Sequence, residues 1–435
     1  MTIRSSLAGL AAAVSMLALV PALGAEPAAY AKEGPSVAVT YRQWTAADFG
    51  RGTFDGTAVS GDALVLTAPT GTFDYTDPYG DGSATYDVGT WTSPVVTPGF
   101  AFTQLVSSWN ATTPPGTWIQ MSVRGRADDG TMSKPYILGR WASGDGTIHR
   151  TSVPGQGDDL ATVAIDTLML RKDRTMSTWQ LTVSLLRRAG TSASPSVTLV
   201  GAMSSALPDT KKVPASPLGG AEGVTLDVPT YSQEIHKGQY PEWDGGGEAW
   251  CSPTSTSMVV AYWGGGPSPA DYSWVDPSYA DPWVDYAAAN TFDYNYDGAG
   301  NWPFNAAYAA RWTAADGAPL VGFVTRLRSL TEAEQFIKAG IPLVVSVSFK
   351  KNELTGAGYS TGGHLLVIVG FTASGDVVVN DPASHLIASD DAVRTVYNRA
   401  QFENVWIPSD RSGGIAYVIR PADVPLPPAP AQANW

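Results

Sequence analysis

Cysteine is almost absent from this sequence: Cys251 is the only one in 435 residues. A lone cysteine cannot form a disulfide within the chain, so a disulfide-stapled fold is excluded. Histidine is nearly as scarce, with four residues, and no spacing of histidine and cysteine resembles a zinc site. The sequence predicts no metal and no cofactor.

Basic residues are too few to balance the acidic ones. Lys and Arg number 27 against 40 Asp and Glu, which gives a formal net charge of −13. Such a chain lacks the positive surface that binds nucleic acids and anionic membranes, and we expect neither as a partner. The 45 Gly, 32 Pro and 15 Trp, with charged residues at 15%, are typical of a loop-rich secreted protein that contains β-structure.

Long apolar runs are missing except at the N-terminus. Arg4 precedes an almost wholly apolar stretch, 7–20, which at about 14 residues is too short to span a bilayer comfortably. This pattern predicts a signal peptide over residues 1–24, cleaved after Gly24 or, less favoured, after Ala31, with an uncleaved anchor as the alternative. We therefore expect a secreted, extracellular protein that leaves the membrane once it is cleaved.

The first half of the chain carries only β-type patterns. Residues 40–207 alternate apolar and polar side chains in short runs separated by Gly, Asp, Pro and Ser. This alternation predicts antiparallel strands with one buried face, in a β-sandwich or jelly-roll accessory domain. The clearest runs are 63–67, 118–124 and 179–185.

Helix signals appear only in the second half. A mature chain of about 410 residues is too long for one ordinary core, so we expect two domains, joined by a Pro- and Lys-bearing linker at 208–222. An α+β domain is predicted over 223–420, followed by a Pro/Ala-rich tail at 421–435 that we expect to be disordered. In the α+β domain we expect one helix to begin at Ser252–Pro253, and a second to begin at a capping box over Thr331–Glu334 and to end at Gly340. The strands of this domain are expected to cover 341–349, 365–371, 377–379 and 414–419.

Cys251 stands at the start of the first predicted helix. An ordinary thiol, with a pKa near 8.5, is a poor nucleophile at neutral pH, but the positive end of a helix dipole stabilises a thiolate. The position therefore indicates a nucleophile. The alternative is a buried, inert packing residue.

A nucleophilic cysteine needs a base, and His364 is the best placed of the four histidines. It follows Gly362–Gly363 and begins a rigid apolar strand, whereas the others lie in the β-rich half or in polar turns. A hairpin through 372–376 would bring Asp381 alongside, where it could orient the imidazole. The alternative for Asp381 is that Asp-Pro simply starts a turn. The three other histidines are His149, His236 and His385.

The oxyanion of an acyl-transfer reaction needs hydrogen-bond donors. The backbone N–H of Cys251 is one, and a side-chain amide upstream would supply the second. Gln233 is the first candidate and Gln239 the competitor.

Four motifs in order resemble the C39-like branch of the papain-fold cysteine peptidases, over roughly 223–420. They are Val-Pro-x-x-Ser-Gln at 228–233, Trp-Cys-Ser-Pro-Thr-Ser at 250–255, Gly-Gly-His-Leu-Leu-Val-Ile-Val-Gly-Phe at 362–371 and Val-Asn-Asp-Pro-Ala at 379–383.

This resemblance implies a papain-like α+β fold and a peptide or protein substrate. It also implies that Cys251 is the nucleophile, His364 the base, Asp381 the orienting carboxylate and Gln233 the oxyanion donor. The sequence departs from the family pattern at Ser252, where glycine is common, and in a long interval between Gln233 and the cysteine. That interval leaves the choice between Gln233 and Gln239 open.

Two other functions use the same residues differently. One is a cell-wall peptide amidase or transpeptidase, and the other is a non-catalytic binding protein on a papain-like scaffold. The β-rich half could bind cell-wall peptide or carbohydrate, or could cover the peptidase cleft. Seven tryptophans between 240 and 312 could line that cleft or pack beneath it.

A calcium-loop pattern that starts at Asp293 fails at its twelfth position, Phe304, so we expect a tight aromatic loop instead.

Overall fold

The computed structural model describes residues 37–80 and 82–435, so the predicted signal peptide and both cleavage sites lie outside the described residues. Residues 37–435 form one compact unit. No helix in this described part is long and apolar enough to cross a membrane. Two segments are distinguished below: the β region, 38–206, and the C-terminal region, 207–435.

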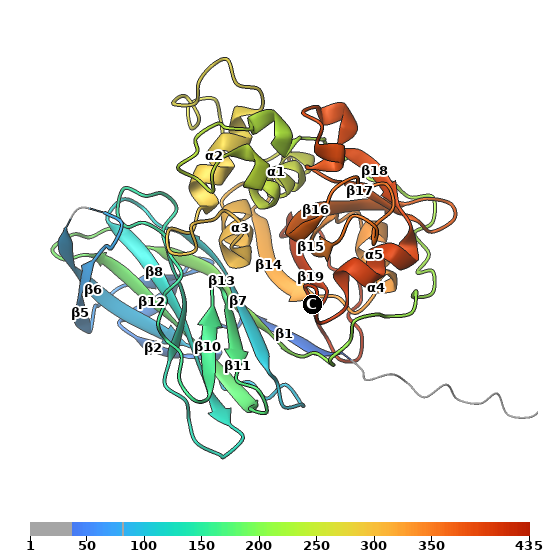
Figure 1. The fold of residues 1–435 in the computed structure, drawn as a ribbon. Coiled ribbons are helices and arrows are strands. Elements are labelled where there is room, and N and C mark those ends of the chain that lie inside the picture. Colours follow the sequence, from blue (N-terminus) through green and yellow to red (C-terminus); the bar gives the residue numbers. More distant parts are fainter. Residues whose placement is uncertain (1–36, 81) are drawn as a thin grey trace, which may run out of the picture. The chain divides into compact units, whose positions relative to one another are not determined.

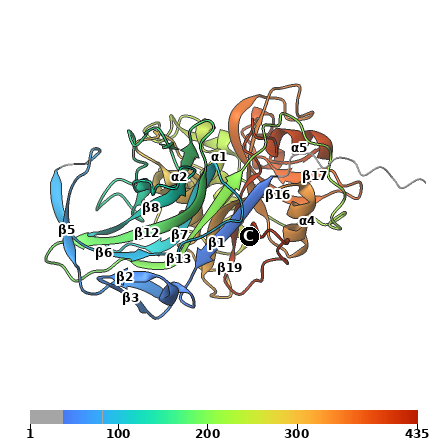
Figure 2. The same cartoon turned by 90° about the horizontal axis from the view of Figure 1, so that it is seen from below.

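The β region consists of two antiparallel sheets (Figure 1). The first has the order β10-β11-β7-β13-β4-β3, with β1 also paired to β13 (Figure 2), and the second has the order β2-β6-β12-β8-β9, with β5 paired to β6. The first sheet contains β1 (Ala38–Trp44), β3 (Thr57–Ser60), β4 (Ala63–Leu66), β7 (Gln104–Thr112), β10 (Ala161–Ala164), β11 (Thr167–Leu170) and β13 (Ser196–Ala206). The second contains β2 (Thr53–Asp55), β5 (Gly71–Thr76), β6 (Ser83–Thr92), β8 (Thr117–Ala127), β9 (Tyr136–Trp141) and β12 (Met176–Arg188).

Large aromatic residues fill the core between these sheets. Alternate residues of β12, among them Leu181, Val183 and Leu185, are fully buried in one cluster with residues of β7 and β13. Trp44 meets Trp91 and Trp179 edge to face, with ring centroids 5.8 and 5.9 Å apart. The N-terminal half is therefore β-rich, as the alternation predicted, because period-2 patterning gives each strand one buried face.

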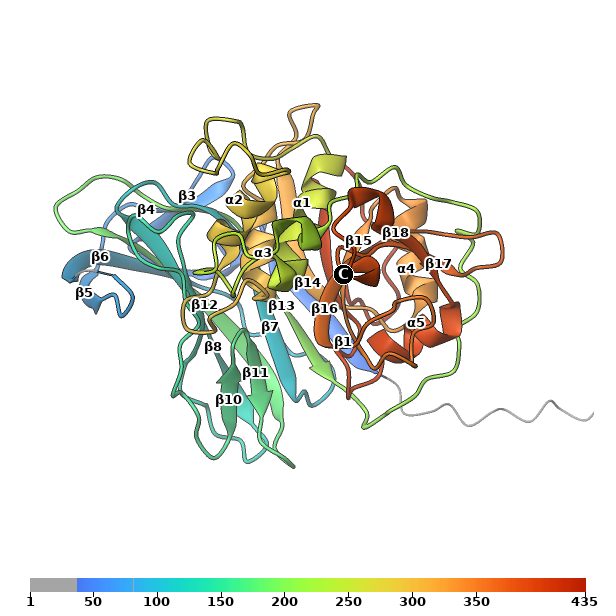
Figure 3. The same ribbon diagram turned by 45° about the horizontal axis from the view of Figure 1, so that its top comes forward.

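The C-terminal region is built on one antiparallel sheet with the order β14-β19-β15-β16-β17-β18 (Figure 1). Helices α1, α2 and α3 gather together, as Figure 3 shows, and α1 contacts β15 and β16. The strands are β14 (Leu320–Arg326), β15 (Leu343–Phe349), β16 (Thr361–Phe371), β17 (Val377–Asn380), β18 (Arg394–Tyr397) and β19 (Ile415–Pro421). The helices are α1 (Cys251–Tyr262), α2 (Pro282–Thr291), α3 (Trp302–Ala309), α4 (Leu330–Lys338) and α5 (Arg399–Trp406).

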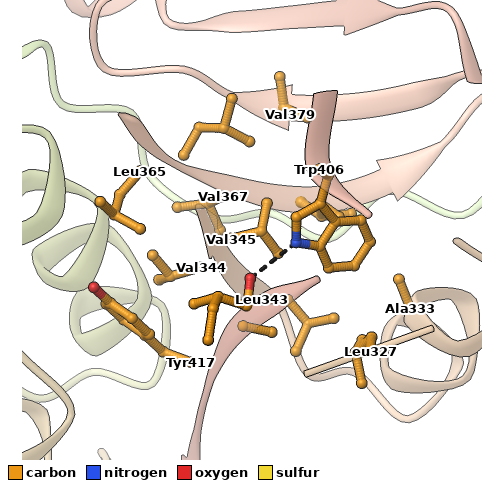
Figure 4. Packing of buried hydrophobic residues seen from close by; sticks show 14 of the residues in the cluster. Leu327, Ala333, Leu343, Val344, Val345, Leu365, Val367, Val379, Trp406 and Tyr417 are labelled. Carbon is orange, nitrogen blue, oxygen red and sulfur yellow. Dashed lines mark hydrogen bonds between the residues drawn. The ribbon is translucent and has the colours of Figure 1, made fainter. Parts of the chain in front are cut away.

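Branched aliphatic side chains of this sheet pack against α5. Figure 4 shows Trp406 among Val345, Val367 and Val379, all of which are fully buried. The indole Nε1 of Trp406 donates a hydrogen bond to the carbonyl oxygen of Ile415 at 2.9 Å, so its one polar atom is satisfied inside the core. The sheet that carries His364 is thus packed on a buried apolar core on this side.

The cap predicted for α4 is wrong by two residues. The N-cap is Ser329, not Thr331, and its Oγ accepts a hydrogen bond from the backbone N–H of Glu332. Ser329 and Thr331 each have a glutamate three residues later, so the sequence pattern does not distinguish them, and only the hydrogen bond from Glu332 identifies Ser329 as the cap. The predicted stop at Gly340 is confirmed, since its φ of +76° is a conformation that glycine adopts without penalty.

The prediction that the tail at 421–435 is disordered is also wrong. Asn434 is fully buried, and its Nδ2 donates to the carbonyl oxygen of Arg326 at 2.7 Å. The ring of Trp435 lies edge-on to Phe336, with centroids 4.9 Å apart. Composition alone missed this, because one amide and one indole at the end of the tail find partners in the folded protein although the residues before them are rich in proline and alanine.

Candidate active site

Cys251 is the first residue of helix α1. The helix is docked on the sheet by Ser255, whose buried Oγ donates to the carbonyl oxygen of Leu365 at 3.0 Å. Leu365 follows His364 on β16, so this hydrogen bond ties the cysteine helix to the histidine strand. Unpaired N–H groups at the start of α1 point toward the cysteine end, as at any helix N-terminus.

The glycine run before Cys251, 245–247, lets the backbone at His236 lie close to the residues that lead into α1. Gly246 has a φ of +110°, which favours glycine. A Cβ on Gly247 would lie 2.3 Å from the carbonyl carbon of His236, so only glycine fits there. The run therefore packs the loop that follows Gln233 against the start of the helix.

His364 and Asp381 form a buried pair. The Nε2 atom of His364 lies 2.8 Å from Oδ1 of Asp381, and both side chains are buried. The expected hairpin brings them together, because Val367 on β16 pairs with Asn380 on β17 and Asp381 follows directly. The predicted closeness of Asp381 to the strand of His364 is thus confirmed.

Three further donors surround the Asp381 carboxylate. The hydroxyls of Tyr359 and Tyr397 donate to Oδ2 at 2.8 and 2.7 Å. The backbone N–H of Ala383 donates to Oδ1 at 3.0 Å. A buried carboxylate with this many donors is held in one orientation and in its charged form.

The electrostatics of the pair favour an imidazolium beside a carboxylate. Burial works against a charged His364, but the charge and hydrogen bond of Asp381, helped by Cys251, outweigh it and raise the pKa of His364 to about 10. Burial alone would raise the pKa of Asp381, but His364 and the two tyrosine hydroxyls lower it. Since Asp381 occupies Nε2 of the imidazole, Nδ1 is the ring nitrogen left for the sulfur of Cys251.

Of the two candidate glutamines, Gln233 lies in the cavity beside Cys251 and Gln239 does not. The side-chain Nε2 of Gln233 donates to the carbonyl oxygen of Glu248 at 2.5 Å, which leaves one amide hydrogen for another acceptor. The side chain of Gln239 is instead engaged with Nδ1 of His236 at 2.9 Å.

The three other histidines stay outside this cavity. His149 pairs with Asp77 at 2.9 Å within the β region. His236 is fully buried and lies 3.2 Å from Asp285. His385 sits in a turn with a φ of +54°.

A cavity of about 930 Å³ opens beside Cys251. His364 and Gln233 line it from the C-terminal region, and Ile165 lines it from the β region. Of the seven tryptophans between 240 and 312, Trp302 lines this cavity, whereas Trp250 is fully buried. Packing therefore accounts for more of the aromatic residues near the cysteine than cleft lining does.

The loop that starts at Asp293 uses its carboxylate to hold the chain. Oδ1 accepts from the backbone N–H of Ser152 at 2.9 Å, and Oδ2 accepts from Nδ2 of Asn301 at 2.8 Å. Among the described residues, no group of three or more His, Cys, Asp or Glu is arranged to hold a metal ion. The expected tight loop thus links the C-terminal region to the β region.

Two family models match the sequence. The model of the peptidase C39 N-terminal domain matches residues 40–205, and that of the peptidase C39-like family matches residues 225–413. The chain belongs to the C39-like peptidase family. The family match to the second segment includes all four of the predicted site residues of this C39-like chain.

Solved structures give only distant likenesses. A crystal structure assigned to a C39-like peptidase from Bacillus anthracis is 19% identical, covers 46% of this chain and 99% of that one, and has a TM-score of 0.27. TmCBM61 in complex with β-1,4-galactotriose is 13% identical, covers 37% of this chain and 86% of that one, and has a TM-score of 0.16. These scores are too low to support an argument about fold or ligand. No curated protein matches the sequence.

Sequence reasoning missed the residues that support the site of this C39-like chain. Tyr359 and Tyr397 hold Asp381, but neither lies in a motif, and only the folded sheet brings them together. Ser252, the departure from the family pattern, has a partner: its Oγ lies 3.0 Å from the hydroxyl of Tyr417 on β19. The hydroxyl of Ser252 thus has a hydrogen-bond partner in the buried hydroxyl of Tyr417. A glycine at position 252 would leave that tyrosine hydroxyl without this partner.

Proposed function

We propose that this chain is an exported cysteine peptidase that hydrolyses peptide bonds through Cys251, His364 and Asp381. The observation that carries the proposal is the buried pair of His364 and Asp381, 2.8 Å apart, beside a cysteine at a helix N-terminus. The cysteine opens onto a cavity of about 930 Å³, which a peptide could enter. Family membership and a cysteine helix docked on an antiparallel sheet both support a papain-like α+β peptidase domain.

The first half of the reaction forms a thioester. The thiolate of Cys251, paired with the His364 imidazolium, attacks the carbonyl carbon of the scissile peptide bond. The backbone N–H of Cys251 and the amide of Gln233 donate hydrogen bonds to the oxyanion. His364 then gives its proton to the leaving nitrogen, the C–N bond breaks, and an amine leaves with the acyl group on sulfur.

The second half returns the site to its starting state. Neutral His364 takes a proton from water, and the resulting hydroxide attacks the thioester carbonyl. The C–S bond breaks, a carboxylic acid leaves, and the thiolate again faces an imidazolium. Asp381 orients the imidazole and stabilises its charge throughout, and the tyrosine hydroxyls keep that carboxylate in place.

Export is part of the proposal and rests on the N-terminal pattern of Arg4 and the apolar run 7–20. The substrate class is a peptide or protein, with cell-wall peptides as one source. In an oxidising compartment the thiol of Cys251 cannot be lost to a disulfide within the molecule, since the sequence holds no second cysteine.

The test is the pH dependence of Cys251 alkylation by iodoacetamide. Wild type should react near pH 6, and His364→Ala should lose that low-pH reactivity, because the imidazolium no longer stabilises the thiolate. His149→Ala is the matched control: it removes another histidine that is paired with an aspartate, at 2.9 Å, and lies outside the cavity. Circular dichroism checks that each variant folds.

An unreactive wild-type thiol at pH 6, or a thiol indifferent to His364, would contradict the proposal and leave Cys251 as a packing residue. If the pair is present, hydrolysis of casein and of purified wall fragments should be compared. Activity on wall fragments alone would select the amidase alternative.

A further inference from the structure

The cavity beside Cys251 is not built by the C-terminal region alone. The β10–β11 hairpin of the β region contributes Ala164, Ile165, Asp166 and Thr167 to its lining. The strands pair from Ala161 and Leu170 to Ala164 and Thr167, so residues 165 and 166 form the turn at the tip. The hairpin tip is therefore one wall of the space that a substrate would occupy.

Asp166 anchors this tip to the cysteine side of the cavity. Its Oδ2 accepts a hydrogen bond from the backbone N–H of Trp302 at 2.8 Å, at the start of α3, and its Oδ1 accepts from Oγ1 of Thr167 at 2.8 Å. Trp302 lines the same cavity. The tip is thus tied to a helix of the C-terminal region and holds a defined position.

The β region is not a detachable cover. Nδ2 of Asn110 donates to the carbonyl oxygen of Gly322 at 2.7 Å, and the N–H of Gly322 donates back to Oδ1 at 3.3 Å. Tyr41 stacks on Phe323 with centroids 4.5 Å apart. Since residues of β14 contact the β region through both backbone and side chains, the hairpin is held beside the cavity.

Ile165 is an unusual residue for this turn. Its φ is +58°, in the left-handed region, where a β-branched side chain is strained and Asn or Gly is the ordinary choice. Among the described residues it belongs to none of the hydrophobic clusters, so core packing does not explain it. Much of the surrounding lining is polar, with Gln233, Glu234, Glu248, Ser360 and Thr361. An isoleucine held there against its backbone preference gives the cavity an apolar contact.

We propose that the β10–β11 hairpin is a specificity element of this peptidase and that Ile165 contacts an apolar side chain of the peptide bound beside Cys251. This inference rests on the proposed function and deepens it. It assigns the β region a direct role in substrate choice, with peptides carrying an aliphatic residue near the scissile bond as the favoured class.

The test compares covalent labelling of Cys251 by dipeptidyl chloromethyl ketones. The probes carry Leu, Ala, Lys or Glu at either of the two positions before the reactive carbon, and the second-order rate constants are measured for each. Wild type should prefer Leu over Ala by at least about tenfold at one position. Ile165→Gly should reduce that ratio to within about threefold, and Ile165→Glu should shift the preference toward Lys.

The control is Asp173→Gly, which replaces another residue with positive φ, +63°, outside the cavity lining. It should leave every ratio unchanged. Ile165→Gly should melt no lower than wild type, since glycine relieves the left-handed strain.

Iodoacetamide labelling, measured in parallel, separates the two proposals. If wild type shows the His364-dependent reactivity but wild type, Ile165→Gly and Ile165→Glu have equal probe ratios, the specificity role is overturned and the peptidase stands. If wild type lacks that reactivity, the peptidase is overturned and the specificity role falls with it.

Discussion

Replacing Asp381 by asparagine should abolish the low-pH reactivity of Cys251. The pKa of His364 is raised from 6.5 to about 10, which corresponds to about 5 kcal/mol in favour of the imidazolium. Asp381 is the main source of that gain, and burial opposes it. Without the carboxylate charge the buried imidazole should be neutral at pH 7, so it no longer supports a thiolate.

The assay is the rate of iodoacetamide alkylation between pH 5 and 9. In wild type the rate should already be high near pH 6. In Asp381→Asn the rise should move toward about pH 8.5, the range of an ordinary thiol, with a fall of about 100-fold at pH 6.

A matched variant separates charge from geometry. Tyr397→Phe removes one hydrogen bond to Asp381, 2.7 Å long, but keeps the carboxylate. It should lower the rate at pH 6 by about tenfold, well short of the 100-fold fall in Asp381→Asn, because the carboxylate charge remains and the lost hydrogen bond, about 1.5–3 kcal/mol, stabilises the carboxylate and not the thiolate directly. A folded Asp381→Asn variant that alkylates at pH 6 like wild type would refute the reasoning.

Three further predictions concern stability. Because the folded pKa of His364 is raised above 6.5, its contribution to the free energy of unfolding is complete below pH 6.5 and is lost as the pH rises through about 10. The contribution of Asp381, whose pKa is lowered, is lost as the pH falls below 3.8. Urea denaturation from pH 6.5 to 10 should therefore show a decline in the free energy of unfolding that His364→Ala lacks. Ser255→Ala should reduce the free energy of unfolding by about 1–3 kcal/mol in urea titrations, because it leaves the buried carbonyl of Leu365 without this donor; no loss would mean that the hydrogen bond does not help dock α1. Asn434→Ala should cost about 1–3 kcal/mol for the same reason at Arg326, and a thermal melt identical to wild type would show that the tail does not stabilise the fold.

The local patterns that predicted strands and turns succeeded where one sequence segment contained the whole element. The hairpin through 372–376 is an example: both strands and the turn lie within about 20 residues, so the register that places Asp381 near His364 follows from the chain itself. The cap of α4 was misplaced because two Ser/Thr residues compete in one short stretch and only the hydrogen bond to Glu332 decides between them.

Contacts between distant segments could not be predicted in this way. The sequence made Gln233 the first candidate and left Gln239 as its competitor. Packing decided that Gln233 faces the cavity of Cys251, whereas Gln239 bonds to His236. Tyr397 contacts Asp381 from the end of β18, and Tyr359 contacts it from the loop before β16. No sequence pattern around either tyrosine indicates that it binds this carboxylate.

The sequence by itself determined the β-rich first half, the helix that starts at Cys251 and the hairpin that joins His364 to Asp381, because each depends on side-chain periodicity or on a short turn. Only the tertiary structure decided what surrounds them. The tyrosine donors to Asp381 and the buried end of the tail join residues that lie from 16 to more than 100 positions apart, and the place of Ile165 in the wall of the cavity likewise depends on distant segments. Such pairs are set by how whole layers pack, and local propensity carries no record of that packing.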